Sequence, residues 1–521
     1  MKKIFKILIA PVTFSLLVSA CHDDLDQSPI DPDSFTEEDV FSNATEAKGA
    51  LAKLYASLTL TGQATTGQAD IADIDEGASQ FTRMLFNLNE LTTDHAVCGW
   101  GDPGLPDLHG MYWTSGNDFS QAMYVRLAQE VSFCNSFISK AAAISDPAIQ
   151  DFLAEARFLR AFAYYNLMDF YANVPLVTKI STELPTQSSR QEIFDFVEAE
   201  LLEIENTLPD NNEYGRVDKV AAWALLSRLY LNAETWTGTQ RYDDCVIYSN
   251  NVINSSYSIN MNDANNNGTS YDELFLADNN SNGAQNEFIF VLSFDGVQSQ
   301  TYGGSTFLIH AAIGGTMDAS AFGVNGGWGG NRTTSALVNK FDTNDQRGMF
   351  YTNGQSLEIQ NISAFEEGYT ITKYKNITST GAQGNDANGE FADTDLPIIR
   401  LAEIYLNYAE ATLRGGNGDL GTAVNLINEL RVRAYGDNSG NISTSALDLD
   451  FVLDERSREL YWEGQRRTDL VRYNYFTTGN YVWPFKGNQP NGASVSNFRN
   501  VFPIPSNSIS TNPNLAQNPG Y

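Results

Sequence analysis

Residues 148–171 read AIQDFLAEARFLRAFAYYNLMDFY, and this stretch decides the fold class. Its apolar side chains recur every three or four residues, which predicts one long helix with an apolar face. Asp146 and Pro147 precede it as a suitable N-cap and first helical residue, and Pro175 lies just beyond its end. Because a long helix must bury its apolar face against other elements, the stretch indicates a mainly α-helical domain.

The same apolar spacing recurs on both sides of this stretch. Short connections join several of the expected helices in pairs, and paired helices of this length favour a TPR-like α-solenoid over a bundle. Asp419 is the expected N-cap of the helix that ends near Arg433. The expected helical regions are residues 36–58, 120–254 (as 120–143, 148–171, 189–208, 219–233 and 242–254) and 396–473 (as 396–414, 419–433 and 450–473).

Two regions, residues 59–119 and 255–395, interrupt the helical pattern. Both are rich in residues typical of loops, and apolar runs in the second, such as residues 287–294, predict a few short strands. Long irregular segments in a compact protein commonly carry function. The sequence therefore predicts a single domain over residues 21–521: a TPR-like helical scaffold with long loop-rich insertions that carry a few short strands.

The N-terminus has the pattern of an export signal. Three lysines within residues 1–6 precede an apolar run over residues 7–18, and small residues then lead to Cys21. This pattern predicts a signal peptide over residues 1–20, and the run is shorter than the about 20 apolar residues of a spanning helix. The segment resembles a bacterial lipobox, which implies cleavage before Cys21 and a lipid (palmitate) anchor on that cysteine. The alternative is an ordinary signal peptide with a chance cysteine.

Composition excludes several classes of partner. The 64 acidic residues outnumber the 32 basic ones and give a formal net charge of −32. Such a surface repels nucleic acid and anionic lipid headgroups. Cys98, Cys134 and Cys245 are widely spaced and odd in number, so we expect small buried side chains instead of a disulfide framework.

No cofactor is expected to be required, and the four histidines have no zinc-site spacing. Residues 278–283 (DNNSNG) match the first half of a calcium loop, but Ile289 stands where the loop needs glutamate. Two readings stay open: a structural calcium ion near Asp278, or an asparagine-rich turn without metal.

Five motifs stand out along the chain. They are residues 155–165 (EARFLRAFAYY), 215–231 (GRVDKVAAWALLSRLYL), 400–411 (RLAEIYLNYAEA), 455–470 (ERSRELYWEGQRRTDL), and 502–505 (FPIP) with 517–521 (QNPGY). In this order they resemble those of the SusD/RagB family of outer-membrane glycan-binding lipoproteins. The resemblance covers essentially all of residues 21–521 and implies TPR-like helices, a non-enzymatic glycan site and a SusC-like TonB-dependent transporter as partner.

The fourth motif interleaves carboxylates and guanidiniums. Glu455, Glu459 and Glu463 are four residues apart and share one stripe of a helix, next to arginines such as Arg458 and Arg467. We expect a charge network that fixes the last long helix to the scaffold. The alternative is an enzyme in which Glu459 or Glu463 acts as a general acid.

The loops contain the residue types that bind sugars. Aromatic rings stack on the apolar face of a pyranose, and guanidinium or carboxylate groups hold its hydroxyls in pairs. Starch-binding members of the family combine two tryptophans and a tyrosine in a curved arc with an arginine and an aspartate. The resemblance implies that Trp100, Trp328 and Tyr302 form this arc here. Arg83 and Asp75 match the two polar positions.

One position departs from the family pattern. An asparagine that contacts sugar just after the first tryptophan has no clear equivalent, because residues 101–104 read GDPG. Two readings stay open: Asp102 replaces that contact, or the contact is lost.

We therefore expect a non-catalytic cell-surface lipoprotein that captures starch or malto-oligosaccharides and passes them to a SusC-like transporter. One alternative keeps the architecture but binds a laminarin-type β-glucan or a fructan. A second is a glycoside hydrolase with paired carboxylates among Asp73, Asp75 and Glu76, or Asp393 and Asp395. A third, a TPR scaffold that binds only protein, leaves the loop aromatics unexplained.

Overall fold

The computed structural model describes residues 36–62 and 66–521, so the predicted signal peptide and Cys21 lie outside the described residues. Within them, no helix is both long and apolar enough to cross a membrane. The helices are α2 (Glu37–Val40), α3 (Ala44–Thr59), α4 (Phe81–Asn89), α5 (Leu105–His109), α6 (Asp118–Ala141), α7 (Ala148–Tyr171), α8 (Arg190–Ile204), α9 (Lys219–Leu231), α10 (Ala233–Thr237), α11 (Tyr242–Ile253), α12 (Gly304–Ala311), α13 (Ser335–Val338), α14 (Leu401–Leu413), α15 (Leu420–Tyr435), α16 (Leu449–Leu460), α17 (Arg466–Arg472) and α18 (Ser506–Thr511).

The strands are short and form four antiparallel pairs: β1 with β5, β2 with β3, β4 with β8, and β6 with β7. Their bounds are β1 (Val97–Cys98), β2 (Val174–Pro175), β3 (Gln187–Ser188), β4 (Phe288–Leu292), β5 (Asn331–Arg332), β6 (Phe350–Tyr351), β7 (Thr370–Ile371) and β8 (Leu396–Arg400). The prediction of a mainly α fold with a few short strands is confirmed.

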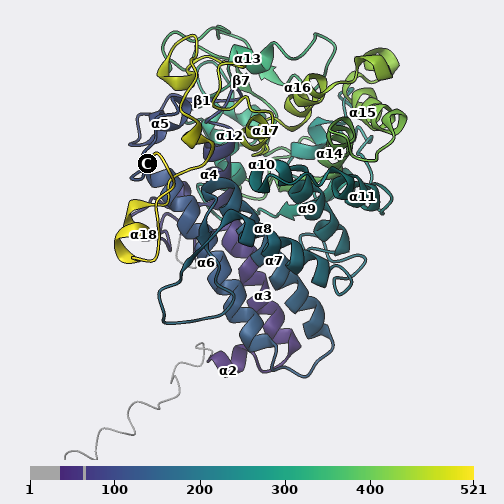
Figure 1. Ribbon diagram of the computed structural model, residues 1–521. Helices are drawn as coiled ribbons and strands as arrows, with labels where there is room; N and C mark the ends of the chain where they lie inside the picture. Colours follow the sequence, from purple (N-terminus) through teal and green to yellow (C-terminus); the bar gives the residue numbers. More distant parts are fainter. Residues whose placement is uncertain (1–35, 63–65) are drawn as a thin grey trace, which may run out of the picture.

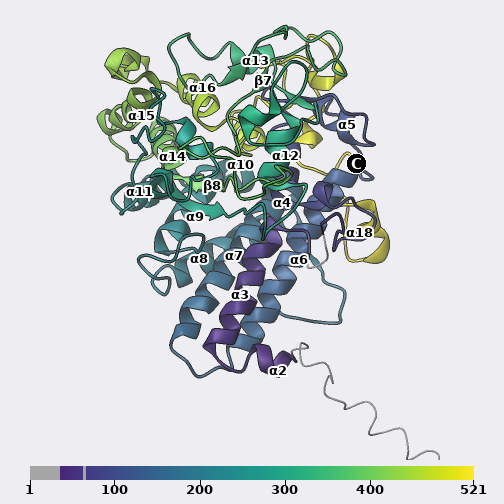
Figure 2. The same ribbon diagram turned by 180° about the vertical axis from the view of Figure 1, so that it is seen from behind.

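The helices pack in succession. Helix α6 contacts α7, α7 contacts α8, and the series continues through α9, α11 and α14 to α15 and α16. Helices α3, α6, α7 and α8 stand side by side in the lower half of Figure 1, with α2 at the lower tip. The loop-rich part around β7 and α13 lies at the opposite end in both views (Figures 1 and 2). This succession is the TPR-like helical architecture that the sequence predicts.

Helix α7 has the predicted bounds and lies at the centre of the stack. The Asp146 carboxylate accepts the Ala148 N–H at 2.9 Å, and Pro147 already has helical dihedral angles (φ −57°). Every residue of its second half is buried, because α7 contacts α3, α6, α8 and α9. The Asp419 cap of α15 is also confirmed, since its side chain accepts the Thr422 N–H.

For two of the expected helices, the prediction is wrong for the first residues. Residues 36–58 form α2 and α3 instead of one helix, because the Asn43 side chain accepts the N–H groups of Thr45 and Glu46 and starts a new helix. Residues 396–400, expected to be helical, form β8 and pair with β4. An apolar run of this length fits a buried strand as well as a helix, and only the partner strand decides between them.

The last helix expected over 450–473 is interrupted between α16 and α17. Trp462 and Gly464 adopt left-handed dihedral angles (φ 64° and 77°), which end a right-handed helix. The buried Glu90 carboxylate accepts the freed N–H groups of Trp462, Gly464 and Gln465 at 3.3, 2.8 and 3.0 Å. Glu90 therefore supplies the hydrogen bonds that a continuous helix would have made itself.

The region 59–119, expected to be loop-dominated, contains the buried helix α4. Eight of its nine residues are buried, including Thr82, Asn87 and Asn89. Its apolar residues Phe81, Met84, Leu85 and Leu88 do recur at helical spacing, but nine residues are fewer than the window over which such spacing predicts a helix, and polar residues between them are buried as well. Cys98, Cys134 and Cys245 are buried and free, as predicted.

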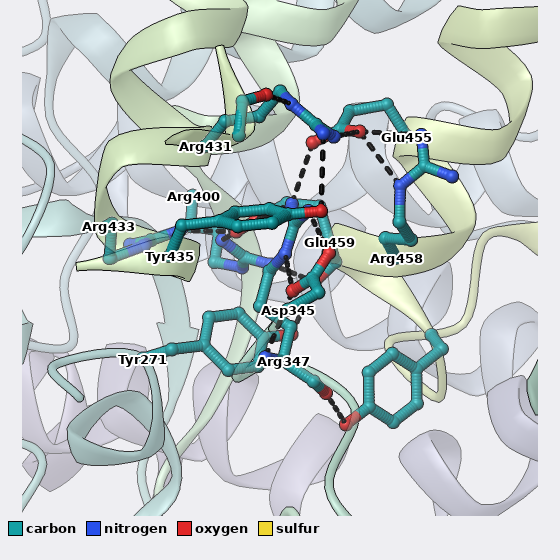
Figure 3. A network of polar contacts seen from close by, with 12 residues as sticks. Tyr271, Asp345, Arg347, Arg400, Arg431, Arg433, Tyr435, Glu455, Arg458 and Glu459 are labelled. Carbon is teal, nitrogen blue, oxygen red and sulfur yellow. Dashed lines mark hydrogen bonds and ion pairs between the residues drawn. The ribbon is translucent and has the colours of Figure 1, made fainter. Parts of the chain in front are cut away.

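The charge network predicted from the fourth motif is present and buried (Figure 3). Arg347 contacts Glu455 at 2.8 Å and Glu459 at 3.0 Å, and Arg400 contacts Glu459 at 2.6 Å. Although Glu463 lies beyond the end of α16, it joins the network through Arg400 at 2.7 Å. The network ties α16 to β8 and to the segment before β6, which fits its expected structural role. Its other members are Glu287, Asp345, Lys373, Arg431, Arg433 and Arg458.

Candidate functional site

Three aromatic side chains from distant segments meet at the surface. The ring centroids of Trp100 and Trp328 are 6.4 Å apart, and those of Trp328 and Tyr302 are also 6.4 Å apart. Each side chain is partly exposed. Successive ring planes are tilted by 46° and 55°, so the three rings line a curved surface instead of a flat one. We call this group (Trp100, Trp328 and Tyr302) the aromatic arc.

The pairing of β1 with β5 places the two tryptophans. Val97 and Cys98 lie opposite Arg332 and Asn331, which brings the segments that carry Trp100 and Trp328 together. The indole N–H of Trp100 donates to the carbonyl oxygen of Trp328 at 3.1 Å. Gly330 is required at this contact, since a Cβ there would lie 2.3 Å from the Trp100 ring. The tryptophan pair is thus fixed by backbone geometry before any ligand arrives.

His310, on α12, supports the arc from behind and was missed from the sequence. Its ring stacks on Trp328 at 4.8 Å with 18° between the planes. Carbonyl oxygens of Gly326 and Glu390 lie 2.7 and 3.1 Å from its two ring nitrogens. Burial lowers the pKa of His310, which favours a neutral ring behind the indole. Sequence inspection considered His310 only as a zinc ligand, and its position facing Trp328 exists only in the fold.

Tyr302 is held at both its backbone and its hydroxyl. The Tyr302 N–H donates to the Glu76 carboxylate at 3.1 Å, and its hydroxyl donates to Glu390 at 2.6 Å. The bond to Glu390 together with burial raises the pKa of Tyr302 to about 12. The ring packs beside Phe391, with 5.2 Å between centroids. Glu390 has no sequence motif and was not predicted.

Arg83 lies beside the tryptophan end of the arc. It comes from α4, and its guanidinium carbon is 4.5 Å from the Phe307 ring centroid and 5.8 Å from that of Trp100. Its Nε is buried without a hydrogen-bond partner, and no carboxylate in residues 36–62 or 66–521 forms a salt bridge with it. Burial lowers the pKa of Arg83, against the opposing charges of Asp75 and Asp102. The guanidinium therefore retains hydrogen-bonding capacity that the described residues do not use.

Asp75 lies on the turn that precedes α4. One of its carboxylate oxygens accepts the Ala78 N–H at 3.1 Å, and the side chain is exposed. Gly77 lets this turn approach closely: a Cβ there would be 2.8 Å from Arg83 Nη1 and 2.9 Å from the Tyr302 carbonyl oxygen. The structure thus gathers all five predicted site residues in one region, and whether each contacts a ligand stays a prediction.

The arrangement suits recognition of a polyhydroxylated ring compound. Partly exposed indole and phenol faces offer stacking surfaces for apolar C–H faces. Arg83 and Asp75 offer planar groups that can hold neighbouring hydroxyls in pairs. Asp102 is exposed on the loop after Trp100, where it is available to replace the missing asparagine contact.

The Asp278 turn is closed by other contacts. The two carboxylate oxygens of Asp278 accept hydrogen bonds from the N–H and the hydroxyl of Ser379 at 2.8 and 2.6 Å. In the described part of the chain, no group of three or more His, Cys, Asp or Glu side chains is placed to hold a metal ion. A calcium ion near Asp278 stays a prediction that these contacts do not support.

Comparisons with known proteins extend over almost the whole chain. A family profile described as "SusD family" matches residues 350–521, and another described as "Starch-binding associating with outer membrane" matches residues 108–231. The chain is 35% identical to the "Starch-binding protein SusD" of Bacteroides thetaiotaomicron, over 97% of this chain and 96% of that protein.

Solved structures show the same fold. A SusD superfamily protein from Parabacteroides distasonis has a TM-score of 0.71 at 22% identity, covering 94% of this chain and 100% of that one. A "Laminarin binding SusD-like protein" has a TM-score of 0.70 at 21% identity, covering 92% of this chain and 100% of that one. With ordered motifs, helical architecture and near full-length sequence similarity in agreement, this protein belongs to the SusD family.

Proposed function

We propose that this protein is a non-catalytic, cell-surface glycan-binding lipoprotein that captures starch or malto-oligosaccharides. The aromatic arc carries the proposal, because its 46° and 55° tilts match a chain that curves as it passes over successive rings. An α-1,4-glucan has such a curvature, whereas a straight β-1,4 chain would suit a flat platform. The 35% identity to a relative named as a starch-binding protein supports the same ligand class.

Three of the carboxylates named for the hydrolase alternative, Glu76, Asp393 and Asp395, accept hydrogen bonds from groups inside the protein. Glu76 accepts the hydroxyls of Thr61 and Thr301, each at 2.6 Å. Asp393 accepts the Gly296 N–H at 2.7 Å, and Asp395 accepts the Phe294 N–H at 2.7 Å. These groups act as internal acceptors that hold loops in place. A glycosidase instead needs two carboxylates facing one bond across about 5–9 Å.

The N-terminal pattern supports a membrane attachment through Cys21. A lipid on this cysteine would hold the chain at the outer membrane, and we propose that a SusC-like TonB-dependent transporter receives the captured glycan. The net charge of −32 fits a neutral ligand and a soluble domain displayed outside the cell.

The test is calorimetry on the mature chain from His22, titrated separately with maltoheptaose, α-cyclodextrin and a laminarin oligosaccharide. We expect the first two to bind. The Trp328→Ala variant should weaken that binding by about 1–3 kcal/mol, the contribution of one stacked ring. Tyr112→Ala, at an exposed tyrosine outside the arc, is the control and should leave the affinity unchanged.

Each of the other possible outcomes would overturn a different part of the proposal. Binding of laminarin alone would keep the glycan-binding role and replace the ligand with the β-glucan alternative. Unchanged affinity in both Trp328→Ala and Trp100→Ala would refute the arc. Release of reducing ends during incubation would revive the hydrolase. The transporter is tested by co-purification of a TonB-dependent barrel with the full-length lipoprotein from outer membranes.

A further inference from the structure

A second row of aromatic rings lies on the segment after α17. The centroids of Tyr473 and Tyr475 are 6.2 Å apart with planes at 43°, and those of Tyr475 and Tyr481 are 5.9 Å apart at 41°. All three residues are partly exposed, although the Tyr473 hydroxyl is buried. The corresponding values in the aromatic arc are 6.4 Å with 46° and 55°. This tyrosine row (Tyr473, Tyr475 and Tyr481) therefore nearly repeats the spacing and tilt of the arc.

The loop that carries the row is held from inside. The buried Lys486 ammonium donates to the carbonyl oxygens of Tyr475, Thr478 and Tyr481 at 2.8, 2.7 and 2.7 Å. The Tyr481 hydroxyl donates to the Asp94 carboxylate at 2.6 Å. Because both tyrosines are fixed without a ligand, a sugar chain would lose little binding free energy to ordering them.

Polar groups border the row, as they border the arc. Exposed Asp450 accepts the Tyr475 hydroxyl at 3.0 Å. The Lys340 ammonium lies 5.3 Å from the Tyr481 ring centroid and forms an ion pair with Asp454 at 2.5 Å. The Asp454 side chain is 44% exposed, so it has free acceptor capacity. These charged groups can hold sugar hydroxyls at the edge of a stacking surface.

Two chain segments that carry the tryptophans of the arc also contact the tyrosine row. Asp94, which holds Tyr481, lies in the segment that leads to Trp100, and Lys340 lies in the segment that follows Trp328. The Thr334 hydroxyl donates to the Asp94 carbonyl oxygen at 2.5 Å and joins these segments. Helix α13, just before Lys340, and β1, just after Asp94, both lie in the upper half of Figure 1. The row is therefore built on the same loop-rich end as the arc.

We propose that the tyrosine row is a second, weaker glycan-binding surface that engages a distant part of a chain already held by the arc. This inference rests on the proposed glycan-binding function. A polymer bound at two points on one protein gains avidity without any new contact at the first point. A short oligosaccharide fills the arc alone and gains nothing from the row.

The test compares a short and a long α-glucan, with purified protein titrated with maltoheptaose and retained on amylopectin in affinity electrophoresis. We expect Tyr475→Ala to change the maltoheptaose Kd by less than about twofold and to weaken amylopectin retention by about tenfold or more. Tyr475→Phe keeps the ring and should retain most of the amylopectin binding. Tyr112→Ala, at a tyrosine that is 40% exposed, is the matched control and should behave as the unaltered protein.

A second comparison separates this inference from the proposed function. Trp328→Ala should weaken maltoheptaose binding but keep weak retention on amylopectin, and the double variant Trp328→Ala with Tyr475→Ala should lose that retention. Thermal melting checks that each variant is folded. Equal amylopectin retention by Tyr475→Ala and the unaltered protein, with maltoheptaose still bound at the arc, overturns the row alone. Absence of all glucan binding by the unaltered protein overturns both proposals.

Discussion

Arginine plays opposite roles in the buried network and at the aromatic arc. In the network, Arg400 contacts Glu287, Glu459 and Glu463. At the arc, Arg83 contacts aromatic rings, and no salt bridge to it is found in the described chain. The pKa directions differ accordingly. Burial lowers the pKa of both guanidiniums. At Arg400 the neighbouring glutamates outweigh burial and raise the pKa, whereas the pKa of Arg83 stays lowered.

The difference shows how one residue type serves stability in one region and binding in another. A buried charge whose partners are all internal crosslinks the scaffold, and removing one partner leaves the others uncompensated. A charge left without an internal partner costs stability and remains available to a ligand. Five predictions test this contrast, beginning with the largest expected effect.

Acid should disrupt the network as a whole. Arginines outweigh burial and lower the pKa of Glu455 to about 2, and they lower the pKa of Glu459 as well. Groups with a lowered folded pKa stabilise the fold above their unfolded value near 4.5 and lose that contribution as the pH falls toward 2. We expect the urea midpoint of unfolding to decrease steeply below about pH 4.

The opposite sign should appear at milder pH. Burial raises the pKa of Glu130 and Asp395, each to about 7. These two groups stabilise the fold fully below the pKa values that they have in the unfolded chain, and this contribution is lost as the pH rises through 7. The urea midpoint should therefore increase as the pH falls from 7.5 to about 5. A midpoint that stays constant from pH 5 to pH 3 would contradict the assigned role of the network.

Glu459→Gln should lower the free energy of unfolding by about 3–5 kcal/mol, because it leaves buried guanidiniums without their shared carboxylate. Glu459 contacts Arg347, Arg400 and Arg433. Urea denaturation measures the change. The control is Lys48→Met, which breaks an exposed pair with Glu213 and should cost at most about 1 kcal/mol. Equal losses in the two variants would remove the distinction between buried and exposed pairs.

Arg83→Met should separate binding from stability. Loss of a charged hydrogen-bond donor should weaken glycan binding by about 1.5–3 kcal/mol. The free energy of unfolding should stay the same or increase, because the variant removes a partly buried charge without an internal partner. Calorimetry and urea denaturation on the same sample check both effects. A large loss of stability with unchanged binding would place Arg83 with the scaffold arginines.

Tyr302→Phe should have the smallest effect. It removes the hydroxyl that donates to Glu390 at 2.6 Å but keeps the ring in the arc. Because this hydrogen bond lies within the protein, the expected loss of about 0.5–1.5 kcal/mol falls on the free energy of unfolding, and the affinity should change little. Tyr302→Ala should weaken glycan binding as well, since it removes the stacking surface. If both variants bind equally well, the ring of Tyr302 does not contact the ligand.

Much of the scaffold could be predicted from the sequence, since long amphipathic helices repeat their apolar residues within the reach of local inspection. The bounds of α7 and the cap of α15 were correct for this reason. Prediction failed where a distant partner decides the local structure. Residues 396–400 become a strand because β4 lies beside them, and the break after α16 depends on Glu90.

By itself, the sequence determined the helical class, the family and the five residue types expected at the site, because motifs and spacing are properties of the chain. Only the tertiary structure decided that β1 pairs with β5 and sets Trp100 beside Trp328. It also placed His310 behind Trp328 and gave Tyr302 its partner Glu390. These contacts join residues far apart in the chain, and their geometry arises only when separate loops pack on one scaffold.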